Sequence, residues 1–280
     1  MIASALRRAP LERLGFRPDD AADTGALIAR ADDTVLTAVA ELAERLRARI
    51  ATFPGACPEV DLVEGVSAGE VFLLAFLATV DDVRAAHRAR GIDDDVSWRS
   101  LSDLGQQVGV HRQTYGEFGL HTQDWVASSS WAANLFWLGR LQFNLKDVPD
   151  HPGRWWVSAH IPASGPLTPE LVEHSLGAAQ TFFAAHFADC PADAFHCESW
   201  LLDPQLAEAV PGSNIAAFQA RWSRYGEPYL ADDDVLFFVF RRRGEVDLDL
   251  LPQDSRLERA VVTTLRSGGH WRAYHGLVRW

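Results

Sequence analysis

The spacing of hydrophobic residues changes near residue 139, and this change limits what the chain can fold into. Between Thr24 and Ile50, apolar residues recur three and four positions apart, which is the period of one helix face. From Gly139 to Leu145, apolar and polar residues alternate, as they do in a strand with one buried face. We therefore expect a helical first half and a second half that contains a sheet.

Further helices are predicted before the change. Ser67 and Glu70 form a capping-box pattern, which predicts the start of a helix that ends near Gly91. Another helix is predicted from about Ser97 to Gly109, and a Trp-rich helix from His121 to Leu138. Together with the Thr24–Ile50 stripe, these segments predict an all-helical N-terminal domain.

Strands and helices alternate after the change. Strands are predicted at Gly139–Leu145, Arg154–Ile161, Ala194–Leu202, Asp234–Arg241 and Trp271–Trp280. Helices are predicted after the N-caps Thr168 and Ser213, and from Asp254. This alternation predicts a mixed sheet flanked by helices. We place the domain boundary between residues 1–138 and 139–280.

Composition and charge disfavour several function classes. The 280 residues carry a formal net charge of −12, which disfavours a nucleic-acid partner. Cys57, Cys190 and Cys197 form no CxxC pair, which fits a reducing cytoplasm. The N-terminus does not look like a signal peptide, and the apolar run Val71–Val80 is too short to span a bilayer. Lys146 is the only lysine, a usage typical of GC-rich bacterial genomes.

Six stretches form a distinctive set that covers most of the chain. They are Tyr115–Leu120, Leu138–Leu145, His160–Glu170, Phe195–Pro204, Ser213–Trp222 and Leu251–Val261. As a set they resemble a bacterial N-acyltransferase family, with a helical N-terminal domain before a GNAT-like mixed sheet. The resemblance implies transfer of an acyl group, with acetyl expected, from acyl-CoA to a small-molecule amine. It implies no metal cofactor.

The resemblance also points to a CoA-binding loop. GNAT proteins hold the CoA pyrophosphate with backbone N–H groups where a strand gives way to a helix, and a helix N-terminus favours anions. The residues implied here are Ser164, Gly165, Leu167 and Thr168. Only Gly165 matches a glycine of the usual Q/R-x-x-G-x-G/A motif, and Pro162 and Pro166 each remove an N–H donor. Modified CoA binding and a strand–helix turn without a ligand both stay open.

Amine acylation needs a base for the amine, a donor for the thioester carbonyl and an acid for the thiolate. In GNAT proteins the acyl-pantetheine lies between two adjacent parallel strands, here Arg154–Ile161 and Ala194–Leu202. Glu198 is the predicted base, with His160 and His196 as alternatives. Each of them also has a structural interpretation, as a solvated carboxylate or a hydrogen-bonded histidine.

Further candidates lie on the helix after the second of these strands, beyond that helix and on the strand itself. Ser213 and Asn214 are predicted to contact the pantetheine arm, although Ser213 also suits a helix cap. Tyr225 is a candidate acid for the thiolate, with Tyr229 as its alternative, and both also suit packing. Cys197 is better explained as a buried strand residue than as an acyl-accepting thiol.

The sequence also has to be compared with a metal site, a DNA-binding regulator and a non-catalytic binding protein. His186, Cys190, His196 and Cys197 lie close in sequence, but their spacing meets no standard zinc pattern, so no metal site is predicted. Leu101–Gly119 resembles a helix-turn-helix with Gly109 at the turn, which gives a DNA-binding regulator as one alternative. A GNAT-fold protein that binds a ligand without catalysis is another. The sequence leaves the acceptor, the acyl chain length and the oligomeric state open.

Overall fold

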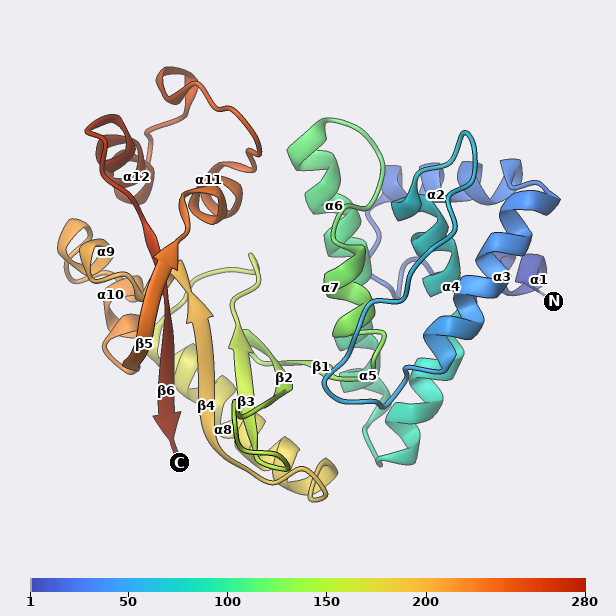
Figure 1. The fold of residues 1–280 in the computed structure, drawn as a ribbon, viewed down its shortest axis with the longest axis horizontal. Coiled ribbons are helices and arrows are strands. Elements are labelled where there is room, and N and C mark those ends of the chain that lie inside the picture. Colours follow the sequence, from blue (N-terminus) through green and yellow to red (C-terminus); the bar gives the residue numbers. More distant parts are fainter. Residues whose placement is uncertain (1) are drawn as a thin grey trace. The chain divides into compact units, whose positions relative to one another are not determined.

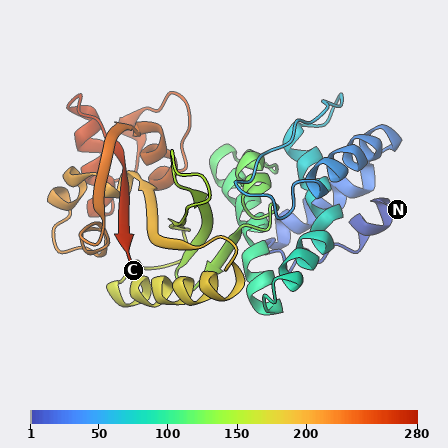
Figure 2. The ribbon, with the colours of Figure 1, turned by 60° about the horizontal axis from the view of Figure 1, so that its bottom comes forward.

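The computed structural model describes residues 2–280, which form two compact units (Figures 1 and 2). Unit 1 extends through Trp137 and also takes in Asn144–Asp147. Unit 2 comprises Leu138–Phe143 and Val148–Trp280. Unit 1 is mainly helical, and unit 2 holds most of the sheet and the helices that flank it.

Unit 1 contains seven helices among the described residues. They are α1 (Ile2–Arg7), α2 (Pro18–Arg30), α3 (Asp33–Arg47), α4 (Ala68–Ala89), α5 (Asp94–Leu101), α6 (Asp103–Tyr115) and α7 (Gln123–Ser128). The predicted capping box opens α4: the Glu70 N–H donates to Ser67 Oγ at 3.2 Å, and the Ser67 N–H donates to the Glu70 carboxylate at 2.9 Å. Two N–H groups that a helix start leaves without partners are satisfied in this way.

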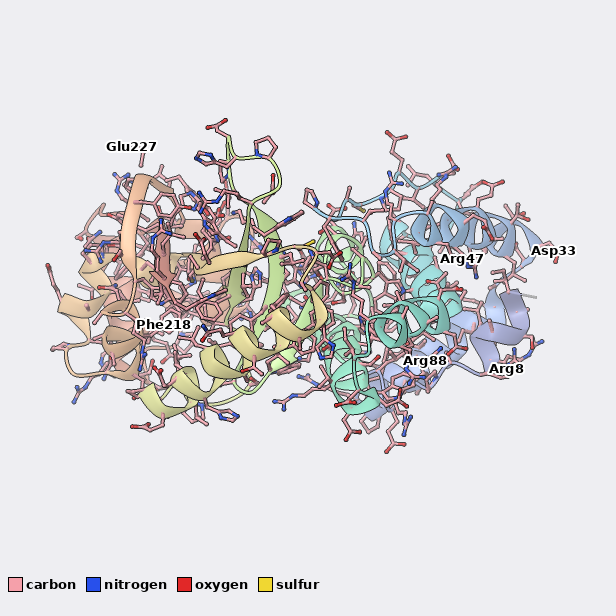
Figure 3. The ribbon with its side chains drawn as sticks, turned by 90° about the horizontal axis from the view of Figure 1, so that it is seen from below. Arg8, Asp33, Arg47, Arg88, Phe218 and Glu227 are labelled. Atoms are coloured by element: carbon pink, nitrogen blue, oxygen red, sulfur yellow. The ribbon has the colours of Figure 1, made fainter. Side chains whose placement is uncertain are left out.

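The prediction of one continuous helix across Thr24–Ile50 is wrong. The stripe belongs to two helices, α2 and α3, which are separated at Ala31 and Asp32. The Asp32 carboxylate accepts from the Val35 N–H at 2.9 Å and so caps a new helix. Arg47, near the end of α3 (Figure 3), donates from Nε to Asp82 of α4 at 2.8 Å.

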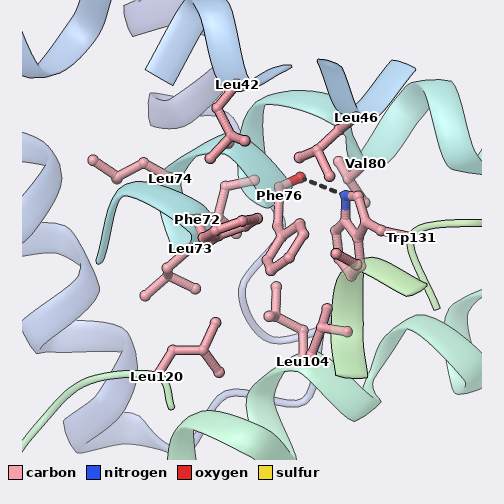
Figure 4. Close-up of a cluster of buried hydrophobic side chains, with 14 of the residues drawn as sticks. Leu42, Leu46, Phe72, Leu73, Leu74, Phe76, Val80, Leu104, Leu120 and Trp131 are labelled. Carbon is pink, nitrogen blue, oxygen red and sulfur yellow. Dashed lines mark hydrogen bonds between the residues drawn. The ribbon is translucent and has the colours of Figure 1, made fainter. Parts of the chain in front are cut away.

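The core of unit 1 lies between α3, α4 and the segment after α7. Leu42 and Leu46 of α3 meet Phe76 of α4 and the Trp131 ring (Figure 4), and all four are at most 2% exposed. Trp131 donates from Nε1 to the Phe76 carbonyl at 3.2 Å, so the buried ring satisfies its polar atom. Burial of each such side chain contributes about 1.5–3 kcal/mol.

The predicted helix from Ser97 to Gly109 is also wrong in extent. Two helices, α5 and α6, meet at Ser102, and α6 continues through Gly109 to Tyr115. A Cβ atom at Gly105 would lie 2.2 Å from the Gly15 carbonyl carbon, so this glycine serves close packing. Because Gly109 lies inside a helix, the helix-turn-helix prediction with its turn at Gly109 is wrong, and with it the basis for a DNA-binding regulator.

The predicted helix from His121 to Leu138 is much shorter. The helix α7 ends at Ser128, and strand β1 (Leu135–Leu138) follows. The side chain of Asn134 bonds both backbone groups of Leu145, donating to its carbonyl at 3.1 Å and accepting from its N–H at 2.9 Å. An amide that matches a strand backbone in this way favours extended chain over helix at this point.

The sheet has six strands in the described chain. They are β1, β2 (Leu141–Asp147), β3 (Trp155–His160), β4 (Ala192–Ser199), β5 (Ser223–Leu230) and β6 (Arg272–Arg279), in the order β1-β2-β3-β4-β6-β5. Strands β3 and β4 are parallel, whereas β6 is antiparallel to both β4 and β5, as the arrows in Figure 1 show. The predicted mixed sheet is confirmed.

The helices of unit 2 are α8 (Pro169–His186), α9 (Pro204–Ala209), α10 (Asn214–Gln219), α11 (Asp232–Phe240) and α12 (Arg256–Arg266), with short 3-10 turns at Trp200–Leu202 and Leu248–Leu250. The predicted N-caps are confirmed, since Thr168 Oγ1 accepts from the Leu171 N–H and Ser213 Oγ from the Ala216 N–H. The helix α8, yellow in Figure 2, runs along one side of the strands.

The predicted strand Asp234–Arg241 is wrong, because this segment forms α11. Three aspartates, 232 to 234, lie in its first turn, where negative charge stabilises a helix. The strand of this region is β5, an edge strand with mostly exposed residues such as Glu227 (Figure 3). An edge strand of this kind has no clear apolar alternation to reveal it.

Among residues 2–280, no helix combines the length and apolar character that crossing a bilayer demands.

Candidate active site

A tight loop connects β3 to α8. Residues 163–166 of this loop are exposed, and the Ser164 N–H donates to the Pro162 carbonyl at 2.9 Å. Gly165 has φ +117°, a conformation that residues with a side chain rarely adopt. Thr168 then caps α8, and Pro169 occupies its first turn. The chain therefore reaches a helix N-terminus through a short, exposed turn.

The side chain of Arg140 contacts this loop at three residues. Its Nε donates to the carbonyls of Gly165 at 3.2 Å and Pro166 at 3.0 Å, and a terminal nitrogen lies 3.4 Å from Ser164 Oγ. Burial lowers the pKa of Arg140. Arg221, just after α10, reaches the Pro169 carbonyl and pairs with Glu173. Two guanidinium groups thus lie beside the positive end of α8, where an anion is favoured.

A carboxylate already uses donors at this helix end. Glu170 is the second residue of α8, and its carboxylate accepts from its own N–H and from Thr168, which together lower its pKa. A lowered carboxyl pKa at this position is consistent with the positive end of a helix dipole. An incoming phosphate would compete with it for these donors.

A second polar group lies where the pairing between β3 and β4 ends. The paired register of the two strands runs as far as Ser158 and His196, whose Oγ and Nδ1 atoms lie 3.1 Å apart. His196 is fully buried and stacks on Trp156, with ring centroids 5.4 Å apart and an interplanar angle of 4°. Its ring is therefore fixed in position and orientation.

Glu198 follows His196 on the same face of β4, since side chains two apart on a strand point the same way. It pairs in register with His275 of β6, whose Nδ1 lies 3.6 Å from Glu198 Oε2. The Tyr229 hydroxyl donates to Glu198 Oε1 at 2.9 Å. We call His196, Glu198 and His275 the His–Glu–His cluster.

Two tyrosines of β5 border the cluster. The Tyr225 ring lies 5.5 Å from the His275 ring and 5.9 Å from the Trp156 ring, measured between centroids. Burial, and then the charge of Glu198, raise the pKa of Tyr225. Burial and the hydrogen bond to Glu198 raise the pKa of Tyr229 as well. Both phenols therefore keep their protons at neutral pH.

The structure brings together only part of the predicted set. Glu198, His196 and Tyr225 share one face of the sheet, whereas His160 ends β3, beyond the last paired residues, and is not one of the three converging side chains. Ser213 caps the start of α10. The contact with α8 comes instead from Arg221, which follows the end of α10. The pantetheine contacts of Ser213 and Asn214 therefore stay a prediction.

Several residues of the site lie outside the predicted set, among them His275 and Arg140. His275 joins the cluster because β6 lies next to β4, a topology that local sequence patterns do not encode. Arg140 follows the turn at Gly139, and only its contacts reveal its role under the loop. Neighbouring His196 and Cys197 point to opposite faces of β4, so they do not form one site with His186 and Cys190.

Comparisons with known proteins agree with this geometry. Residues 7–130 match the N-acyltransferase N-terminal domain, and residues 135–278 match the GNAT-like C-terminal domain. The chain belongs to the GNAT-like N-acyltransferase family. The family predicted from the six sequence stretches is thereby confirmed. No curated protein sequence shows significant similarity to this GNAT-like acyltransferase.

Solved acyltransferases share the whole fold of this GNAT-like acyltransferase. One, in complex with decanoyl-CoA and teicoplanin, is 34% identical with a TM-score of 0.86, and the match covers 96% of this chain and 86% of the other. Another, with decanoyl-CoA, is 35% identical with a TM-score of 0.83 and the same coverage. A mutant acyltransferase with octanoyl-CoA is 34% identical, again with a TM-score of 0.86 and the same coverage. The protein is an acyl-CoA-dependent acyltransferase, which displaces the alternative of a non-catalytic ligand-binding protein.

Proposed function

We propose that this acyltransferase moves its acyl group to the amine of a small molecule by direct attack on the thioester. The observation that carries the proposal is the His–Glu–His cluster, which lies where the pairing of β3 and β4 ends. A base at this point faces the place where GNAT proteins hold the acyl-pantetheine arm. Trp156 and Tyr225 supply apolar walls that limit water next to it.

The donor is proposed to bind at the start of α8. Backbone N–H groups around Ser164, Gly165, Leu167 and Thr168, together with the helix dipole, favour the CoA pyrophosphate. Arg140 and Arg221 add positive charge near the helix start. Ser213 and Asn214 are proposed to contact the pantetheine arm.

Glu198 is proposed as the base, with His275 as its partner. The amine nitrogen attacks the carbonyl carbon, its proton passes to Glu198 directly or through water, and the bond from carbon to sulfur breaks. His275 is near enough to share the charge of Glu198, at 3.6 Å. Because the pKa of Tyr225 is raised, its phenol still carries a proton to give to the departing thiolate. His160 and His196 stay alternative bases.

The acyl chain is proposed to be of medium length. Acetyl transfer, expected from the sequence, stays a prediction. The solved relatives hold decanoyl-CoA and octanoyl-CoA, and at 34% identity over nearly the whole chain they support a donor of similar length here.

The acceptor is proposed to be a large amine-bearing small molecule. One relative is solved with teicoplanin, and another with CoA and 10C-teicoplanin. The net charge of −12 is compatible with a cationic amine. We further propose a bacterial cytoplasm as the place of action, since none of the three cysteines forms a disulfide within the described residues.

The test measures thiol release and product mass with acetyl-CoA, octanoyl-CoA and decanoyl-CoA, each offered teicoplanin, a polyamine and an aminoglycoside. We expect an amide product with at least one amine, and faster turnover with the longer donors. Acetyl-CoA as the fastest donor would overturn the chain-length proposal alone. Thiol release without amide product, in every combination, would overturn amine acylation.

A further inference from the structure

The three side chains of the His–Glu–His cluster come from two adjacent strands and converge at one place on the sheet. One ligand atom from each of His196, Glu198 and His275 lies within 4.8 Å of the other two. Two imidazoles and one carboxylate are the ligand set that Zn²⁺ takes in open sites with three protein ligands. We propose that this cluster binds a Zn²⁺ ion, and that the bound ion inhibits acyl transfer.

Strand geometry fixes the three ligands. His196 and Glu198 are two residues apart on β4, so they project from the same face. His275 is paired in register with Glu198 on the adjacent strand β6. Directly opposed residues of antiparallel strands have Cβ atoms about 5 Å apart. Ligands on paired strands hold their spacing more rigidly than ligands on loops.

Neighbouring groups orient two of the ligands as metal sites require. His196 Nδ1 lies 3.1 Å from Ser158 Oγ, so Nε2 is the ring nitrogen that we propose as the metal ligand. The Tyr229 hydroxyl occupies Glu198 Oε1, and Oε2 is the oxygen that faces His275. Hydrogen bonds of this kind select the coordinating atom and raise metal affinity.

The site is also accessible and near the size that zinc needs. His196 is buried, but the side chains of Glu198 and His275 are 36% and 27% exposed, so an ion has a path in and a free fourth position. Bonds of about 2.0 Å in a tetrahedron place ligand atoms about 3.3 Å apart. A shift of about 1.5 Å closes the widest gap, within reach of side-chain rotation.

Inhibition follows from the shared atoms, and this part rests on the proposed function. Zinc bound to Glu198 and His275 occupies the lone pairs that would take the amine proton. An occupied base cannot act, so the free protein is the active form and the ion is an inhibitor, not a cofactor.

Binding is tested by calorimetry with ZnCl₂ and by the visible absorption of Co²⁺, with MgCl₂ as the negative control. We expect one Zn²⁺ per chain and a cobalt spectrum typical of tetrahedral coordination. Glu198→Gln and His275→Gln should each lower zinc affinity by about ten-fold or more, and Ser158→Ala by about ten-fold. Zinc affinity unchanged in both ligand variants overturns the site.

A matched control comes from the second close histidine pair. His111 and His121 of unit 1 have Nδ1 atoms 3.3 Å apart, so they are the competing place for adventitious zinc. His121→Gln should leave affinity and the cobalt spectrum unchanged. Loss of binding in this variant, with retention in Glu198→Gln, would assign the zinc to unit 1 and overturn the proposal.

To test inhibition, ZnCl₂ is added to the acyl-transfer assay and is then removed with a chelator. We expect activity to fall at the zinc concentrations that calorimetry gives and to return on chelation. Binding without inhibition would show that the base lies elsewhere. If no acceptor is acylated, the proposed function fails, while calorimetry and cobalt absorption still decide the zinc site.

Discussion

At the scale of single residues, Glu198 is central to the proposed site, because both of its carboxylate oxygens lie near polar groups. A phenol donates to one of its oxygens, and an imidazole lies near the other. We expect Glu198→Gln to lower kcat by about 10²–10⁴-fold, because the amide cannot take a proton, with little change in the KM for acyl-CoA. Steady-state kinetics over a range of pH measures both values.

The matched control for this variant is Asp193→Asn. Asp193 lies on the same strand β4, but it pairs with Arg154 and Arg279 at the exposed end. Its variant should keep kcat within about two-fold, as expected for an exposed ion pair of small energy. Equal losses in both variants would mean that β4, and not the base, had been damaged.

His87 gives a pH prediction for stability. Burial, and then the charges of Arg84 and Arg88, lower the pKa of His87 to about 4, and Ser97 holds its ring at 2.9 Å. In the unfolded chain His87 takes up a proton near pH 6.5, whereas in the folded chain it does so only near pH 4. The stabilisation is therefore fully present above pH 6.5 and is lost as the pH falls toward 4. Urea unfolding should show a loss of roughly 2 kcal/mol between pH 7.5 and 5 from this group.

The variant His87→Gln identifies the source of that loss. Glutamine does not titrate, so the variant should be less stable at pH 7.5 but lose much less on acidification. If wild type and variant lose the same stability between the two pH values, other groups control the acid response.

At the scale of elements, the start of α8 is the proposed binding site for the acyl-CoA donor. Glu170 uses donors that a pyrophosphate would need. We expect Glu170→Gln to tighten acyl-CoA binding by about two- to five-fold, because it removes a negative charge from the helix N-terminus. Calorimetry with Glu208→Gln on α9, which makes the same charge change elsewhere, provides the comparison. Weaker binding in Glu170→Gln would place the phosphates away from this helix start.

Local sequence signals located several helix starts, but they did not fix every element's type and extent or show which strands are neighbours. The caps at Ser67, Thr168 and Ser213 are determined by a few neighbouring residues, so the sequence alone locates these helix starts. A short apolar run is compatible with strand or helix, which is why Asp234–Arg241 was assigned to the wrong class. His275 joins the site only through the order β4-β6-β5, which no local pattern contains.

At the scale of the whole molecule, the change of hydrophobic period near residue 139 separates a helical part from a part with a sheet. The contacts draw the border less simply, since Asn144–Asp147 belong with unit 1 although they continue strand β2. The border between the two units therefore falls within β2, between Phe143 and Asn144. Sequence periodicity reports local structure, and it does not report which unit a residue packs in.

Calorimetric titration of the 280-residue chain with decanoyl-CoA is the first measurement to make. Wild type is compared with Gly165→Val in the β3–α8 loop and with Gly153→Val at the other end of β3. Both glycines have positive φ and open space at Cβ, so each variant strains the backbone at its own turn without a steric clash. We predict saturable binding to wild type and Gly153→Val, and binding at least about ten-fold weaker in Gly165→Val. Equal affinity in all three proteins, or no binding to wild type, would contradict a donor site at the start of α8.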